Sequence, residues 1–226
     1  GEIWGYETEG FYQTQSDVEK HADQSKLGSN WSPGDIMYKD LDGNGKINNG
    51  SNTLEDHGDL KIIGNTTPRY QYGITANISY KNTYVNIFFQ GIGKRDFWPS
   101  SQPFWPVSTQ YYNTQKWFVT DSWTEDNRNA YFARPIARDS KNQQQQTKYL
   151  QDASYCRLKN LTIGYDFPKT WLDFFHIGKA GIYFSAENLF EFTSVKGAYD
   201  PEAAAKKGTM VYPFQRTYSF GLNVTF

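Results

Sequence analysis

The sequence contains one segment, residues 69–92, in which apolar and polar side chains alternate almost without interruption. Strict alternation is typical of a β-strand, because successive side chains point to opposite faces of the sheet. The alternation breaks once, at Lys81 and Asn82, and a two-residue turn there would fold the segment into an antiparallel hairpin. The hairpin would place these residues opposite each other: Tyr80 and Thr83, Ile78 and Val85, Ala76 and Ile87, and Ile74 and Phe89. A slip of one residue would separate the two apolar faces, so the pattern predicts a defined register.

The same two-residue period recurs toward the carboxyl terminus. In the last twelve residues, the even positions from Tyr218 to Phe226 are bulky and apolar, whereas the odd positions are small or polar. The opening twelve residues show the pattern more weakly. The sequence therefore predicts an all-β chain of antiparallel strands, at about residues 2–12, 69–80, 83–92, 155–167, 179–190 and 215–226.

The predicted strands are joined by short and long connections in alternation. The short connections cover two residues at 81–82 and ten residues at 168–177. The long connections cover about residues 13–68, 93–152 and 191–214. Outer-membrane β-barrels have this arrangement, with short turns on the periplasmic side and long loops on the extracellular side. The sequence thus predicts part of a transmembrane barrel whose three long loops are extracellular.

The composition is compatible with a membrane barrel. Mean hydropathy is −0.75, and no stretch approaches the ~18 consecutive apolar residues of a membrane-spanning helix. A membrane-spanning strand needs only ~9–11 residues with every second one apolar, so its mean hydropathy is low. The net charge of −1 gives no reason to expect a nucleic-acid partner.

Six strands are too few to close a transmembrane barrel, since the smallest known examples have about eight. An open edge in lipid leaves backbone N–H and C=O groups unpaired, at a cost of several kcal/mol each. We therefore expect the other strands to come from another chain or from another part of a longer polypeptide. The first residue, Gly1, is not a methionine, and this favours a piece of a longer polypeptide.

The segment DLDGNGKIN, residues 40–48, has the spacing of a calcium-binding loop. Oxygen donors stand at Asp40, Asp42 and Asn44, and the carbonyl of Lys46 would be a further ligand of an ion that prefers hard oxygen atoms. The position of the bidentate glutamate in an EF-hand holds a serine, so a closing carboxylate would have to come from farther along the chain. The alternative is an Asx-rich surface turn without a metal ion.

Residues 96–123 combine nine aromatic side chains with three prolines. Aromatic rings stack on sugars and anchor protein interfaces, and prolines lower the entropic cost of presenting them. The candidates for contact with a ligand or partner are Trp98, Phe104, Trp105, Tyr111 and Tyr112. The alternative is that these rings fill a small hydrophobic core within the loop.

No catalytic constellation is evident in the sequence. His21, His57 and His176 stand in unrelated contexts, and neither H-E-x-x-H nor G-x-S-x-G occurs. Cys156 stands within a strand pattern, where a small packing residue is a simpler interpretation than a nucleophile. We therefore expect a protein that is not an enzyme.

Six separated stretches occur in order along the chain: GYETEGFYQT, PGDIMYKDLDGNGKI, GDLKIIGNTTPRYQYG, YCRLKNLTIGYDFP, AENLFEFTS and YSFGLNVTF. Together they resemble the carboxyl-terminal barrel region of SusC/RagA-type TonB-dependent outer-membrane transporters. The resemblance covers nearly the whole chain and is weakest in residues 96–152 and 196–214. It implies a 22-stranded barrel with an amino-terminal plug, energised through TonB. It also implies a SusD-like surface lipoprotein that closes over the barrel mouth to capture glycans or peptides.

The resemblance also implies how the acidic loop is completed. In the family, this loop usually closes on an aspartate five residues before an Ile-Gly pair. Here Asp59 stands five residues before Gly64, behind an inserted segment, so it is the expected closing ligand, with Asp56 as the second choice. The terminal aromatic strand resembles the signal that the barrel-assembly machinery reads.

The alternation assigns each strand one face toward lipid and one toward the barrel lumen or the plug. The residues expected to face lipid are Tyr72, Ile74, Ile78, Val85, Ile87, Phe89, Ile163, Phe220, Leu222 and Val224. The residues expected to face the lumen or the plug are Asn77, Asn86, Thr162, Asp166 and Asn223. The main alternative is a secreted β-sandwich, stabilised by calcium, that binds carbohydrate through an aromatic platform. A glycan hydrolase would need a pair of carboxylates in a cleft, and the sequence offers no candidate pair.

Overall fold

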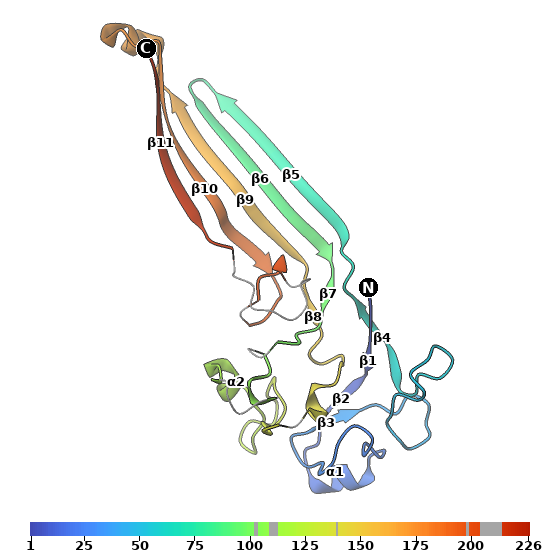
Figure 1. Ribbon diagram of the computed structural model, residues 1–226. Coiled ribbons are helices and arrows are strands. Elements are labelled where there is room, and N and C mark those ends of the chain that lie inside the picture. The colour runs from blue at the N-terminus through green and yellow to red at the C-terminus, as the bar shows by residue number, and fades with distance from the viewer. Residues whose placement is uncertain (102–103, 109–112, 139, 198, 204–213) are drawn as a thin grey trace.

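The structure is a computed structural model that describes residues 1–101, 104–108, 113–138, 140–197, 199–203 and 214–226. It consists of a long antiparallel sheet and a compact lobe at one end of this sheet (Figure 1). The carboxyl terminus lies at the end of the sheet that is far from the lobe. Among the described residues, no helix has the length and apolar character needed to cross a membrane.

The sheet has five strands in the order β11-β10-β9-β6-β5, and all neighbouring pairs are antiparallel. The strands are β5 Arg69–Tyr80, β6 Thr83–Lys94, β9 Tyr155–Asp166, β10 Lys179–Thr193 and β11 Thr217–Thr225. They lie where the alternation of the sequence predicts them, with differences of at most three residues at their ends. At nine to fifteen residues, each strand is long enough to cross the hydrocarbon region of a membrane.

Strands β5 and β6 form the predicted hairpin in the predicted register. Tyr80 pairs with Thr83, and the other three predicted pairs are also present. The turn consists of Lys81 and Asn82, and Lys81 has a φ of 53°. Positive φ is typical of the tight turns whose twist matches that of the flanking strands. The prediction of this hairpin is confirmed.

One face of the sheet is apolar and exposed. The other carries mostly small and polar side chains, together with the rings of Tyr84, Phe88 and Tyr183, which lie over Gly164, Gly73 and Gly221 of neighbouring strands. The exposed apolar side chains include Tyr72, Ile74, Ile78, Ile163, Ile182, Phe220, Leu222 and Val224. On the polar face, the hydroxyls of Thr162 and Ser185 lie 3.2 Å apart and form a hydrogen bond between β9 and β10. Strands β5 and β11 are the two edges, so the sheet is open and does not close a barrel by itself.

Near the lobe, β9 contains one extra residue relative to β6. Phe88 pairs with Asn160 and the next residue, Phe89, pairs with Leu158, so Lys159 has no partner in this ladder. An extra residue reverses the alternation of the strand that carries it. On the lobe side of this bulge, the odd-numbered residues of β9 therefore lie on the polar face of the sheet.

Strand β10 bulges at the same level, where Asn188 and Leu189 have no partner on β9. Asn188 has a φ of 52°, in the left-handed region that asparagine tolerates better than most residues. Its side-chain Nδ2 donates a hydrogen bond of 3.1 Å to the carbonyl of Gln215. The asparagine of the AENLF segment thus shapes the bulge and ties β10 to the residues before β11.

The lobe is built from residues before β5 and from residues between β6 and β9. Its elements are β1 Glu2–Tyr6, β2 Thr8–Phe11, α1 Gln15–Lys20, β3 Ile36–Tyr38, β4 Leu60–Asn65, β7 Asp96–Phe97, η1 Pro106–Ser108, α2 Lys116–Thr120, η2 Lys141–Gln143 and β8 Gln151–Asp152. β1 pairs with β4, β2 with β3, and β7 with β8.

Residues 2–12, which the sequence predicts as one strand, form two strands in the structure. These residues form β1 and β2, which pair with β4 and β3 and lie outside the five-stranded sheet. Tyr6 and Phe11 belong to the core of the lobe, so packing rather than lipid covers their rings.

The two longest connections share this core. Its buried members come from both connections and include Ile36, Tyr38, Ile47, Phe104, Trp105, Phe118, Trp123, Phe132 and Tyr149. A polar contact joins the same connections at Asp35, which is fully buried. The Asp35 carboxylate accepts a hydrogen bond of 2.9 Å from Asn142 and forms an ion pair of 2.9 Å with Lys141. A buried carboxylate is costly unless it is paired, so these contacts fix the two connections to each other.

Candidate metal centre and lobe surfaces

The acidic loop that is predicted to bind calcium lies between β3 and β4. Gly43 and Gly45 have φ values of 73° and 79°, which lets the backbone coil around the Asp40 side chain. The Asp40 carboxylate accepts hydrogen bonds of 2.7 Å from the backbone N–H groups of both glycines. The side-chain oxygen of Asn44 accepts a hydrogen bond of 2.8 Å from the backbone N–H of Lys46.

Asp59 reaches this loop from the residue before β4. It is fully buried, and its carboxylate accepts hydrogen bonds from the backbone N–H groups of Leu41, at 2.8 Å, and Asn48, at 2.9 Å. Carboxylate oxygens of Asp40, Asp42 and Asp59 all lie within 4.8 Å of one another. Folding therefore gathers three carboxylates that the sequence separates by up to nineteen positions.

Asp56, the second candidate for the closing ligand, belongs to a separate turn. Its carboxylate accepts hydrogen bonds from the hydroxyl and the backbone N–H of Ser51, at 2.6 Å and 2.9 Å. These bonds hold the pKa of Asp56 below its usual value, and the bond from the hydroxyl has the largest effect. The structure thus brings Asp59 rather than Asp56 to the acidic loop.

The donor set of the loop suits a hard divalent cation. Asp40, Asp42 and Asp59 offer carboxylate oxygens, Asn44 an amide oxygen and Lys46 a backbone carbonyl, which are the ligand types that calcium prefers. The hydrogen bond from the backbone of Gly45 is the main cause that keeps the pKa of Asp40 below its usual value. Ionised carboxylates this close repel one another, and a bound cation would relieve that repulsion.

The aromatic candidates divide between the core and the surface of the lobe. Phe104 and Trp105 are only 1% and 7% exposed, and their ring centroids lie 4.8 Å apart. The expectation that these two rings contact a ligand is corrected, because the lobe core already covers their faces. Trp98 is half-buried against the same core, so its contact with a partner stays a prediction. Tyr111 and Tyr112 lie outside the described residues.

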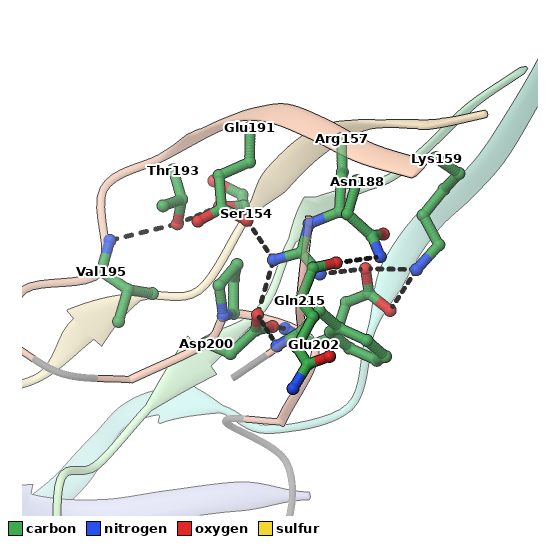
Figure 2. A network of polar contacts seen from close by, with 12 residues as sticks. Ser154, Arg157, Lys159, Asn188, Glu191, Thr193, Val195, Asp200, Glu202 and Gln215 are labelled. Carbon is green, nitrogen blue, oxygen red and sulfur yellow. Dashed lines mark hydrogen bonds and ion pairs between the residues drawn. The ribbon is translucent and has the colours of Figure 1, made fainter. Parts of the chain in front are cut away.

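A charged cluster that the sequence analysis missed lies where the sheet approaches the lobe (Figure 2). Arg157 of β9 is 1% exposed and pairs with the carboxylates of Glu191, Asp200 and Glu202. Its hydrogen bonds to Asp200 and Glu202 are each 2.7 Å long. Lys159 adds a hydrogen bond of 3.0 Å to Glu202. The cluster therefore ties β9 and β10 to the segment that follows β10.

One feature of the sequence could have indicated this cluster. Arg157 and Lys159 occupy odd positions of β9, in line with the apolar row that contains Leu161 and Ile163. Two charges in a row that faces lipid would be costly, so their presence indicates a change of face. Their acidic partners lie 34 to 45 residues farther along the chain, and no local pattern connects them.

Comparison of the sequence with protein-family models gives no match. Among curated proteins, TonB-dependent receptor P3 of Formosa agariphila is 32% identical over the whole chain, and the match covers 22% of that receptor. TonB-dependent receptor SusC of Bacteroides thetaiotaomicron is 26% identical over 98% of the chain, which corresponds to 20% of SusC. The chain thus spans about a fifth of the length of these relatives.

Among solved structures, the RagAB peptide transporter contains a chain that matches this one over its whole length. The TM-score is 0.66 at 22% identity, and the match covers 23% of the transporter chain. The RagAB peptide importer in its closed-closed state gives a TM-score of 0.67 at 21% identity. At these identities, the likeness establishes the fold: the sheet and the lobe correspond to one part of a much larger chain.

Proposed function

This chain belongs to the TonB-dependent receptors of the SusC/RagA type, as the carboxyl-terminal region of their barrel, and we propose that it serves nutrient import across the bacterial outer membrane. The observation that carries the proposal is the open sheet, with one exposed apolar face, one polar face and two unpaired edges. Such a sheet is stable where lipid covers the apolar face and further strands pair with the edges.

The apolar face is too large for a surface that contacts water. Ile74 and Ile78 are each 58% exposed, and Leu222 is 66% exposed. Complete removal of one such side chain from water stabilises a protein by about 1.5–3 kcal/mol, and soluble monomers rarely leave a contiguous patch of this kind uncovered. A β-sandwich would cover the face with a second sheet, but the other strands of the described residues form only short pairs in the lobe. This geometry argues against the secreted carbohydrate-binding sandwich.

In this proposal the lobe faces the cell exterior. The long connections gather at the lobe end of the sheet, and the short connections lie at the opposite end (Figure 1). Outer-membrane barrels place their long loops outside the cell. The lobe would there contact a SusD-like lipoprotein and the glycan or peptide held between them, with Trp98 as a candidate contact. TonB would supply energy through the amino-terminal part of such a receptor, and the plug would fill the lumen beside the polar face.

We also propose that the acidic loop holds a structural calcium ion. Asp40, Asp42, Asn44, Lys46 and Asp59 would supply its oxygen ligands. The ion would join the coil after β3 to the residue before β4, and so would stiffen the first long connection. Transport of this kind needs no catalytic residue, and we assign none.

Localisation and uptake in the host cell test the proposed function. The full-length receptor is expected in the outer-membrane fraction. Uptake of fluorescently labelled oligosaccharides or peptides should be lost when the receptor gene or the TonB gene is deleted. Recovery of the folded receptor from the periplasm, or uptake that does not change on deletion of the receptor, would overturn the proposal.

A further inference from the structure

The connection between β9 and β10, residues 167–178, carries an exposed aromatic group. It contains helix α3, Lys169–Leu172, followed by the single turn η3, Asp173–Phe175. Trp171, Phe174 and Phe175 are 60%, 80% and 67% exposed. A plain turn of polar residues would suffice to join two neighbouring antiparallel strands, as the turn between β5 and β6 shows. Three large exposed rings in one short connection therefore require another explanation.

Trp171 continues the apolar face of the sheet, and Phe174 and Phe175 follow it in the chain with their ring centroids 5.0 Å apart. The ring centroid of Phe167 lies 5.7 Å from that of Tyr165 on β9 and 6.4 Å from that of Trp171 on α3. Tyr165 shares its row on β9 with Ile163, which is exposed on the apolar face. Leu172 is the residue of α3 that is buried, so it anchors the helix while Trp171 remains outside.

The length of the strands places this connection at the surface of the membrane. β9 has 12 residues and so is about 40 Å long. At the tilt of about 40° that is usual in outer-membrane barrels, such a strand spans about 30 Å, which is close to the thickness of the hydrocarbon core. The residues directly after β9 therefore fall at the level of the lipid headgroups. Tryptophan and other aromatic rings are enriched at that level, where an apolar ring lies beside a polar layer.

We propose that α3 and η3 form an aromatic foot, consisting of Trp171, Phe174 and Phe175, which inserts into the headgroup layer of the periplasmic leaflet. The inference rests on the proposed function, because it requires the apolar face of the sheet to contact lipid. The occupant is phospholipid, since Trp171 extends the lipid-facing row of Tyr165 and Phe167, and the exposed rings of Phe174 and Phe175 follow in the same connection. Exposed Lys169 precedes the foot and suits anionic headgroups, whereas Lys179, which follows it, pairs with Asp166 at 4.0 Å.

Depth-dependent quenching of a fluorescent label tests the foot. The full-length receptor would carry Cys156→Ser to remove the free thiol of this chain, with any other free thiols of the receptor also replaced. Single cysteines would then be introduced as Phe174→Cys or Phe175→Cys and labelled with bimane. The receptor would be reconstituted in vesicles of phosphatidylethanolamine and phosphatidylglycerol that contain lipids with a nitroxide at the headgroup or at a deep acyl position.

Two reference positions make the result interpretable. Ile74→Cys lies on the apolar face of the sheet, and Glu19→Cys lies exposed on α1 in the lobe. We expect headgroup nitroxides to quench labels at positions 174 and 175 at least threefold more than the label at position 19. We expect deep nitroxides to quench the label at position 74 more strongly than those at 174 and 175.

The outcomes separate the foot from the proposed function. Quenching at position 74 without quenching at positions 174 and 175 would overturn the foot and leave the barrel in place. No quenching at position 74 would overturn the lipid-facing sheet, and the foot with it. A second measurement uses the variant with Trp171→Ala, Phe174→Ala and Phe175→Ala. Its unfolding temperature should fall in vesicles but stay unchanged in detergent micelles, and an equal fall in both would show packing within the protein.

Discussion

The guanidinium of Arg157 donates a hydrogen bond of 2.7 Å to the carboxylate of Asp200, 43 residues later in the chain. This bond joins a strand of the sheet to the segment between β10 and β11. Arg157 can reach that segment because the bulge of β9 turns it to the polar face. The segment is therefore held against the sheet by charge as well as by its covalent connections.

Replacement of Arg157 by methionine should release this segment. The variant Arg157→Met leaves three carboxylates together without their shared cation, and loss of one partner from a buried ion pair costs about 3–5 kcal/mol. Trypsin added to intact cells should cleave within residues 194–216 faster than in the unmodified receptor. Lys159→Met is the matched control, because Lys159 is more exposed, at 18%, and among the described residues its one carboxylate partner is Glu202, beside a ring contact with Phe214, so its loss should cost less than that of Arg157. Equal cleavage rates in the two variants would contradict the central role of Arg157.

Calcium should stabilise the receptor through Asp59 and not through Asp56. A ligand at a hundredfold excess over its Kd stabilises the folded state by about 2.7 kcal/mol, and this gain should be visible as a rise in Tm when calcium replaces EGTA. The rise should be lost in Asp59→Asn and retained in Asp56→Asn, because only Asp59 joins the three-carboxylate cluster. A calcium effect that is the same in both variants would place the ion elsewhere.

A charge on the apolar face of β11 should impair membrane assembly. Leu222 is 66% exposed and faces away from the polar row that contains its neighbour, Asn223. An arginine on the lipid face costs about 2–4 kcal/mol near the centre of the bilayer, whereas one on the lumen face is solvated. Leu222→Arg should therefore give less folded receptor in the outer membrane than Asn223→Arg, as measured by the mobility of unheated samples in SDS gels. The opposite order would reverse the assignment of the two faces.

Alanine and glycine at position 188, in the bulge of β10, should differ in their effect on the stability of the receptor. At a φ of 52°, an alanine side chain is disfavoured by about 1–2 kcal/mol, while glycine adopts this conformation freely. Both variants lose the hydrogen bond from Asn188 to Gln215, so Asn188→Ala should be less stable than Asn188→Gly. The temperature at which the folded band disappears from SDS gels measures the difference. If the alanine variant were as stable as the glycine variant, the backbone at position 188 would have moved away from positive φ, and the prediction would be wrong.

The sheet could be predicted from the sequence because its register depends on local alternation. The pairing of Ile78 with Val85 follows from the two-residue period of both strands and from the two-residue turn that joins the strands. The bulges could not be predicted in the same way, because the alternation of apolar and polar residues does not show where one strand gains a residue relative to its partner. The charge of Arg157 in an apolar row was the available sign, and its meaning depended on partners far along the chain.

The lobe was harder to predict than the sheet. Its strands are short, and the position of Phe104 in the core is decided by contacts with residues such as Phe132 and Tyr149. Composition indicated that an aromatic cluster exists, but not which rings it buries. Asp40 and Asp42 could be proposed as ligands from their spacing, whereas Asp59 required the resemblance to known transporters.

The buried contact between Asp35 and its partners Lys141 and Asn142 limits how the two longest loops can evolve. If one loop were exchanged for that of a related receptor, a charge in the interior would lose its counterpart. A change of cargo that demands a new loop shape would then have to alter both segments at once. In this part of the receptor, specificity for cargo would therefore evolve in the two loops together and not in either loop alone.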